Sequence, residues 1–214
     1  MDLLNQIEVR VLGALIEKAV TTPDHYPLSL NALTSACNQS SNRDPVVHYD
    51  EQTVADGLDS LCRRNLVHIV DRGDSRVTRY RHVAHETWGL NPAETAVMGV
   101  RMLRGPQTVG EIRTRSTRLH DFRSLDEVGV TLNALIAREP DPFVARLPRQ
   151  PGQKEVRYAH LLAGEFVPEE VESVASDLPA SSERLTRLED LTGKLKAEVE
   201  GLRQQFEQFR KEFE

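Results

Sequence analysis

The chain has 214 residues, of which 39% are hydrophobic and 28% are charged, and its net charge is −6 at pH 7. It has no run of about 18 apolar residues and no basic and apolar leader at its start, so we expect neither a membrane span nor a secretory signal. Cys37 and Cys62 lack CxxC or Cys/His spacing, which indicates a reducing compartment and no metal site. We therefore expect a cytoplasmic protein with one large or two small domains and an appendage.

The charge is spread unevenly along the chain. Residues 1–86 carry −3, residues 87–163 carry +3 and residues 164–214 carry −6. A protein that binds nucleic acid strongly usually shows a clear basic excess, because phosphate contacts supply most of the affinity. Only the middle of this chain is basic, and only mildly.

The first part of the chain reads as three helices followed by a hairpin. Apolar residues at helical spacing predict a helix over residues 4–16 that ends before Thr21-Thr22-Pro23. Ser29 and Asp50 are suited to capping the second and third helices. Residues 66–83 alternate apolar and polar side chains around a turn, which predicts two antiparallel strands.

The same order of elements then returns. Asn91, followed by a proline at the first helical position, starts a helix, and Thr108 and Ser124 cap two more. Residues 143–162 again predict a strand, a Pro-Gly turn and a strand. Individual residues match as well: Glu8 with Glu94, Val11 with Val97, Gly13 with Gly99, Arg79 with Arg157, Tyr80 with Tyr158 and His82 with His160.

Three helices closed by a two-stranded wing are typical of the winged helix, a variant of the helix-turn-helix. The sequence therefore predicts a mainly α fold with small β-sheets, built from two tandem winged-helix domains at residues 1–86 and 87–163.

The remaining residues have a different composition. Residues 164–183 are acidic and contain prolines and serines, which indicates a linker. Residues 184–214 follow a heptad repeat, which predicts a C-terminal coiled coil and a dimer. The alternative is a single amphipathic helix that packs back on the body. The apolar positions of the heptads are Leu185, Leu188, Leu195, Val199, Leu202, Phe206, Phe209 and Phe213.

Several long and unusual motifs resemble the YceH-like family of bacterial tandem winged-helix proteins. They are Val20-Thr21-Thr22-Pro23, Tyr26-Pro27-Leu28-Ser29, Ala36-Cys37-Asn38-Gln39, Asn42-Arg43, Arg104-Gly105-Pro106-Gln107-Thr108 and Pro148-Arg149-Gln150-Pro151-Gly152. The resemblance covers nearly the whole chain. It implies the fold and a bacterial cytoplasmic origin, and it implies no activity and no functional residues.

The residues do not indicate catalysis. The seven histidines form no HExxH or other paired ligand pattern, and the chain has no GxGxxG, Walker or GxSxG motif. Cys37 and Cys62 fall on the apolar faces of predicted helices, where a thiol is structural rather than reactive. His82 and His160 recur at equivalent wing positions, which suggests a shared structural role. We expect no enzyme, no cofactor and no metal.

Two classes of function remain. The first is a regulatory protein that binds double-stranded DNA as a dimer, with the first winged helix and its wing in contact with the duplex. The second is a scaffold that uses winged helices to dock proteins, which suits the acidic start of both third helices. The candidate contacts for DNA or a protein partner are Gln39, Asn42, Arg43, Arg63, Arg64, Arg72, Arg76 and Arg79. A secondary basic patch consists of Arg113, Arg115, Arg118 and Arg123.

Overall fold

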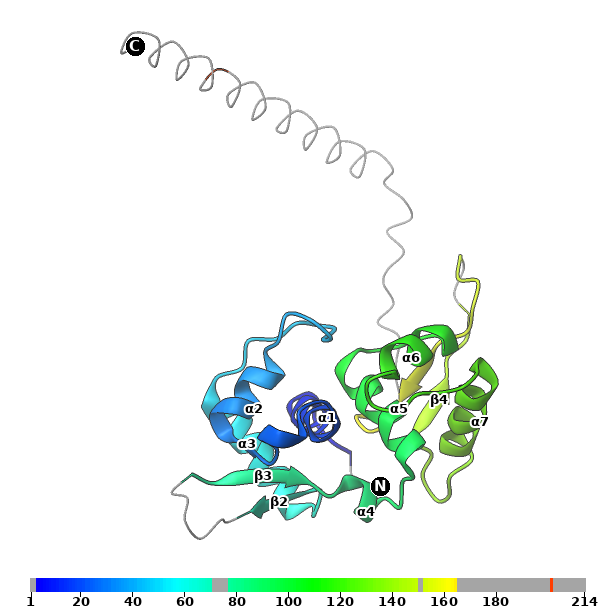
Figure 1. Cartoon of the computed structure of the whole chain (residues 1–214). Helices are drawn as coiled ribbons and strands as arrows, with labels where there is room; N and C mark the ends of the chain where they lie inside the picture. The colour runs from blue at the N-terminus through cyan, green and yellow to red at the C-terminus, as the bar shows by residue number, and fades with distance from the viewer. Residues whose placement is uncertain (1–2, 71–76, 150–151, 165–200, 202–214) are drawn as a thin grey trace. The chain divides into compact units, whose positions relative to one another are not determined.

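The computed structural model describes residues 3–70, 77–149, 152–164 and Gly201 (Figure 1). Apart from Gly164 and Gly201, the predicted linker and coiled-coil segment, including its apolar core positions, lie outside the described residues. Among the described residues no helix is both long and apolar enough to cross a membrane.

The described residues contain seven α-helices and short antiparallel strands, which confirms the mainly helical fold with small sheets. Three helices followed by two paired strands occur once before a short helix at Ala84–Thr87 and once after it. In chain order the elements are α1 (Gln6–Thr21), η1 (Pro23–His25), β1 (Leu28–Ser29), α2 (Leu30–Cys37), α3 (Glu51–Arg63), β2 (Val67–Val70), β3 (Arg79–His82), α4 (Ala84–Thr87), α5 (Pro92–Leu103), α6 (Val109–Ser116), α7 (Leu125–Ile136), β4 (Val144–Arg146) and β5 (Tyr158–His160).

The helices begin where the sequence predicts. Ser29, Asp50 and Asn91 each accept a hydrogen bond from a backbone N–H three residues later, and so do Thr108 and Ser124. These side chains satisfy backbone donors that the first helical turn leaves unpaired. All five predicted caps are confirmed.

The two small sheets share a register. In the first, β2 pairs with β3, and Val67 lies opposite His82; in the second, β4 pairs with β5, and Val144 lies opposite His160. The strand β1 also joins the first sheet, with Leu28 opposite Tyr80, so this sheet has three strands where the sequence predicts two. The second sheet has a matching isolated bridge between Gln107 and Tyr158.

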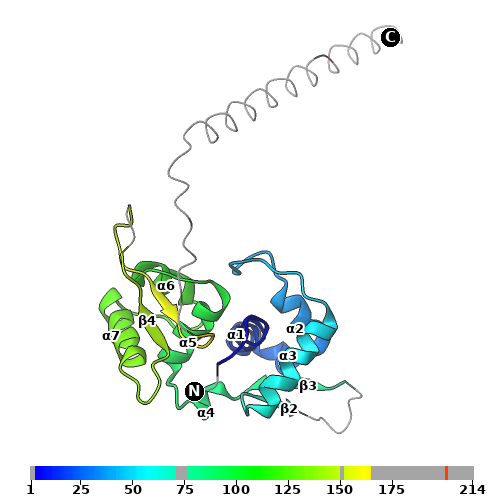
Figure 2. The same cartoon turned by 180° about the vertical axis from the view of Figure 1, so that it is seen from behind.

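The described residues up to Gly164 belong to one compact unit, in which the first half (residues 3–70 and 77–86) and the second half (residues 87–149 and 152–164) share a single hydrophobic core. The helices α1 and α5, which are equivalent in the two halves, pack directly against each other, and both views show them side by side (Figures 1 and 2). Residues Glu8 to Glu17 of α1 are all buried, because α2 and α3 pack against α1 as well.

Two matched glycines permit this close packing. A Cβ atom on Gly13 would lie 2.8 Å from the Cβ of Met102, and one on Gly99 would lie 2.7 Å from Cγ2 of Ile16. Real Cβ atoms do not approach other heavy atoms this closely. The repeat therefore places a glycine of each half at its contact with the other half.

Candidate functional site

The loop between α2 and α3 holds Arg43 inside the protein. The residue is only 6% exposed. Its Nη1 and Nη2 donate to Glu17 Oε1 at 3.2 Å and Oε2 at 2.7 Å, and its Nε and Nη2 donate to the Ala36 carbonyl at 3.1 and 2.7 Å. The sequence predicts a contact between Arg43 and DNA or a partner, but the donors of Arg43 are used within the first half. Arg43 can be buried because Glu17 on α1 supplies a carboxylate that pairs with its guanidinium.

The same loop joins the two halves. The backbone N–H of Asp44 donates to the Leu103 carbonyl at 2.9 Å, and Arg104 Nη2 donates to Asn42 Oδ1. Asn42 adopts a φ of 60°, a left-handed conformation that asparagine tolerates better than most residues. Arg10 on α1 donates to the Pro45 carbonyl at 2.6 Å. Through Asn42 and Asp44, this loop therefore connects the first half to the second half. The internal repeat of the sequence does not by itself predict this connection.

The electrostatics of the loop agree with a structural role. Burial raises the pKa of Glu17, but the hydrogen bond and charge of Arg43 outweigh it, and the resulting pKa lies below its usual value. Burial raises the pKa of the Cys37 thiol to about 12, so this cysteine stays protonated at neutral pH. Gln39 Oε1 accepts from Lys18 at 3.3 Å and from Arg43 at 3.2 Å.

The remaining predicted contacts of the first half are dispersed. Arg63 is exposed at the end of α3. Arg64 pairs with the buried carboxylate of Glu8 at 3.4 Å, and Arg79 donates to the Pro27 carbonyl at 2.9 Å. Arg72 and Arg76 lie outside the described residues. In the described part of the first half, Arg63 alone among the predicted arginines is both exposed and without a hydrogen bond to the protein.

The third helices, α3 and α7, expose acidic and apolar side chains. On α3 the exposed residues are Glu51, Gln52, Asp56, Asp59 and Arg63. On α7, Leu125 is 51% exposed and Val130 is 68% exposed, next to the exposed Asp126.

The exposed side of α7 forms one wall of a groove. The groove has a volume of about 620 Å³, and α6, α7 and the β4–β5 hairpin contribute to it. Its lining is mainly apolar, and the carboxylates of Asp126 and Glu155 are its charged groups. We call this feature the α7 groove, and its lining residues are Val109, Gly110, Leu125, Asp126, Gly129, Val130, Asn133, Glu155, Val156 and Tyr158.

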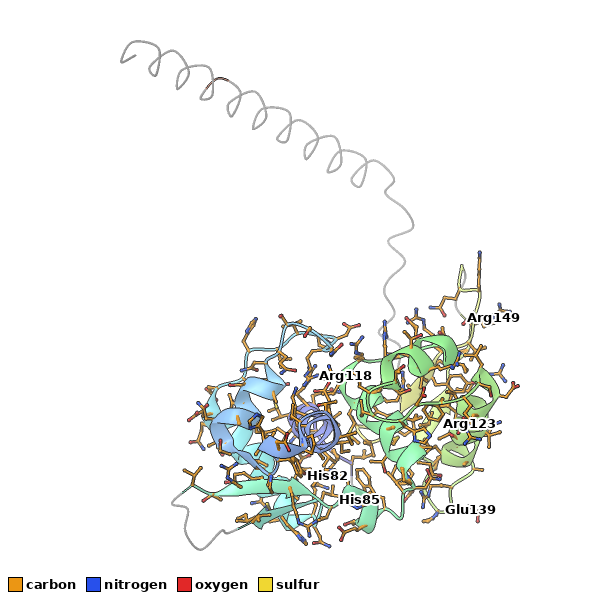
Figure 3. All side chains as sticks on the ribbon, in the orientation of Figure 1. His82, His85, Arg118, Arg123, Glu139 and Arg149 are labelled. Carbon is orange, nitrogen blue, oxygen red and sulfur yellow. The ribbon has the colours of Figure 1, made fainter. Side chains whose placement is uncertain are left out.

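The secondary basic patch divides into two pairs. Arg113 donates to the carbonyls of Phe122 and Arg123 at 3.2 Å and so holds the loop before α7, while Arg115 pairs with Glu111 at 3.3 Å. Arg118 and Arg123 are exposed, and neither side chain has a partner in the part of the chain that the structure describes. Figure 3 places Arg118 on the side of the second half that faces α1 and Arg123 away from it.

A second cavity lies between the halves. It has a volume of about 200 Å³. The sequence gives no direct signal for it, because its walls come from segments more than 50 residues apart. We call it the inter-half pocket, and its lining residues are Glu17, Thr21, Asn42, Gly99, Val100, Leu103, Arg104, Thr114, Arg115, Arg118 and Leu119.

His82 and His160, one in each small sheet, have no catalytic arrangement. Burial lowers the pKa of both His82 and His160 to about 4, so both are neutral at pH 7. Their identical position in the two sheets agrees with a shared structural role. The described ranges bring together no group of three His, Cys, Asp or Glu side chains that could hold a metal ion.

The chain is thus a mainly helical protein of two similar halves. The halves pack closely at Gly13 and Gly99, and the protein carries the α7 groove and the inter-half pocket. Residues 4–153 match the family described as "Protein of unknown function, DUF480", and the chain belongs to this family. It is 50% identical to a UPF0502 protein of Geobacter sulfurreducens and 46% identical to one of Pelobacter propionicus, with 99% of each chain covered. It is 51% identical to a UPF0502 protein of Opitutus terrae over 84% of this chain and 76% of the relative. The resemblance to a bacterial family is thereby confirmed.

Proposed function

We propose that the two halves are tandem winged helices and that the protein is a regulatory module that docks a protein segment in the α7 groove. The observation that carries this proposal is the character of the helices that a winged helix presents to its partner. Both α3 and α7 expose carboxylates, and α7 adds large apolar side chains.

The surface of α3 favours a protein partner over DNA. Glu51, Asp56 and Asp59 are exposed along it, and Arg63 is its single exposed cation. A helix that enters the major groove lies between two rows of phosphates, so each carboxylate on it repels the duplex. Glu51 also stabilises the start of the helix through the helix dipole, and this effect accounts for a carboxylate at this position even if no protein docks there.

The α7 groove has the properties of a peptide site. Leu125 and Val130 expose apolar surface that water solvates poorly, and the groove gives that surface a concave shape. Asp126 and Glu155 are acidic. Charge complementarity therefore selects a partner segment that carries apolar residues together with Lys or Arg.

Peptide selection tests this function. A library of random peptides displayed on phage, panned against the full-length protein, is expected to yield sequences with apolar and basic residues. Val130→Asp should weaken the selected peptides at least about tenfold, because it removes apolar contact and buries a charge. Ile69→Asp is the matched control, since Ile69 is 60% exposed on β2 and lies outside the groove. An unenriched library, or equal losses in both variants, would overturn the proposal.

Association with double-stranded DNA is the second candidate, and exposed unpaired arginines favour it. Arg63 ends α3, and Arg118 and Arg123 lie in the loop between α6 and α7. Contact of the duplex with these arginines and with the wing of the first half would give binding that weakens with salt and depends little on base sequence.

The heptads of residues 184–214 predict self-association, and no observation on the described residues tests it. Light scattering of a chain truncated after residue 183 would test this prediction.

A further inference from the structure

We propose that the inter-half pocket binds a small dianionic ligand, such as a phosphoryl compound, between the two halves. The pocket collects arginines in a protein whose net charge is −6. Arg104, Arg115 and Arg118 line one side of it from the second half, and Glu17, Thr21 and Asn42 line the other side from the first half. This inference does not depend on the docking function proposed above.

The carboxylates near the pocket are already engaged. Glu17 accepts two hydrogen bonds from the buried guanidinium of Arg43 and also lies 3.5 Å from Lys18. Glu111 pairs with Arg115 at 3.3 Å and with Arg157 at 3.8 Å. Because each carboxylate faces two cations, the pocket keeps an excess of positive charge.

The arginines affect one another across the pocket. Burial lowers the pKa of Arg104, and the positive charges of Arg115 and Arg43 lower it further, while the carboxylates of Glu17 and Asp44 offset part of this effect. A ligand with negative charge would relieve this repulsion. Arg118 has no hydrogen bond or ion pair with any described residue, so its guanidinium is available at the rim of the pocket.

The pocket also offers one neutral donor, and its volume suits a small anion. Asn42 uses its Oδ1 to accept from Arg104, which leaves its Nδ2 as a donor with no partner in the described ranges. Thr21 and Thr114 also line the pocket, but their hydroxyls donate to the carbonyls of Glu17 and Gly110. Its volume of about 200 Å³ equals that of about six or seven waters at roughly 30 Å³ each. This space suits phosphate, pyrophosphate or a small dicarboxylate, and it falls below the 300–1,000 Å³ typical of drug-sized ligands.

The planar guanidinium favours the phosphoryl compound. Its paired N–H donors match two oxygens of a phosphate or carboxylate, and the two charges of a phosphoryl group suit several arginines at once. Since both halves contribute walls, the ligand would bind only when α1 and α5 are packed, and it would stabilise the folded protein by mass action.

Calorimetry with the full-length protein tests the site, with inorganic pyrophosphate in one arm, succinate in a second and sodium chloride of equal ionic strength as reference. We expect saturable binding of one pyrophosphate per chain. Arg118→Gln should weaken that binding about tenfold or more, because it removes a charged hydrogen-bond donor. Arg123→Gln makes the same change of charge on an exposed arginine outside the pocket and should change the affinity less than about twofold.

Each result decides between defined outcomes. Binding of succinate with the same dependence on Arg118 would support the site and assign it to dicarboxylates. Equal weakening by Arg118→Gln and Arg123→Gln would overturn the proposal, because it would show unspecific anion binding. The absence of saturation by either probe at about 10 mM, a concentration that detects even weak sites, would overturn it as well. Both variants change exposed side chains, and thermal melting of each variant would check that it is folded.

Discussion

Gly13→Ala is expected to lower the free energy of unfolding by about 2 kcal/mol, although alanine is the better helix former by about 1 kcal/mol. The added methyl group would lie 2.8 Å from the Cβ of Met102. A Cβ atom is fixed to its backbone, so α1 and α5 would have to separate, and the shared core would lose contacts along both helices. Urea denaturation followed by circular dichroism measures the effect.

A matched control separates this contact from helix propensity. Gly129 lies inside α7, and a Cβ atom there would meet nothing within 4 Å. Gly129→Ala should therefore raise the free energy of unfolding by about 0.5–1 kcal/mol, through propensity alone. Gly99→Ala should cost about as much as Gly13→Ala, because the atom it meets is Cγ2 of Ile16, a buried β-branched side chain in α1 with a restricted χ1. If all three variants were stabilised, α1 and α5 would not pack as described.

Arg43→Met is expected to cost about 3–5 kcal/mol of unfolding free energy, the usual range for removal of one partner of a buried ion pair. The substitution keeps much of the side-chain volume but leaves the carboxylate of Glu17 without its main partner. It also removes the donors that satisfy the Ala36 carbonyl. Arg123→Met, at an exposed arginine without a partner, is the control and should change stability by less than about 0.5 kcal/mol.

The cost of Arg43→Met should depend on pH. The pKa of Glu17 in the folded protein lies below its value of 4.5 in the unfolded chain. The stability it contributes is therefore fully present above about pH 4.5 and is lost as the pH falls through the folded pKa. The difference in stability between the unmodified protein and Arg43→Met should narrow in acid. A difference of the same size at pH 7 and pH 3 would contradict the ion-pair account.

Local sequence signals predicted the secondary structure well. Each predicted cap, from Ser29 to Ser124, has a short polar side chain placed just before an apolar helical pattern, so local chemistry is sufficient to find it. The repeat predicted matching element orders for the same reason. The third strand of the first sheet was missed because β1 has only two residues, Leu28 and Ser29, and shows no alternation of its own.

The sequence did not predict contacts between residues that lie far apart in the chain. Arg43 reads as a surface arginine in a polar loop, and its burial depends on Glu17, which lies 26 residues earlier on α1. The inter-half pocket depends on how α1 packs on α5. One signal was present, because Gly13 and Gly99 are matched glycines inside helices, where a glycine is costly unless another backbone approaches closely.

The central functional claim is that α3 and α7 present a surface for proteins and not for DNA. Selection from a pool of random duplexes at about 50 mM salt tests it most directly, since low salt favours every electrostatic contact. The account predicts that no sequence motif is enriched and that Arg63→Ala leaves the weak residual binding unchanged. Enrichment of one motif, with an affinity that falls steeply with salt and is lost in Arg72→Ala/Arg76→Ala, would contradict it and establish the first half as a DNA reader.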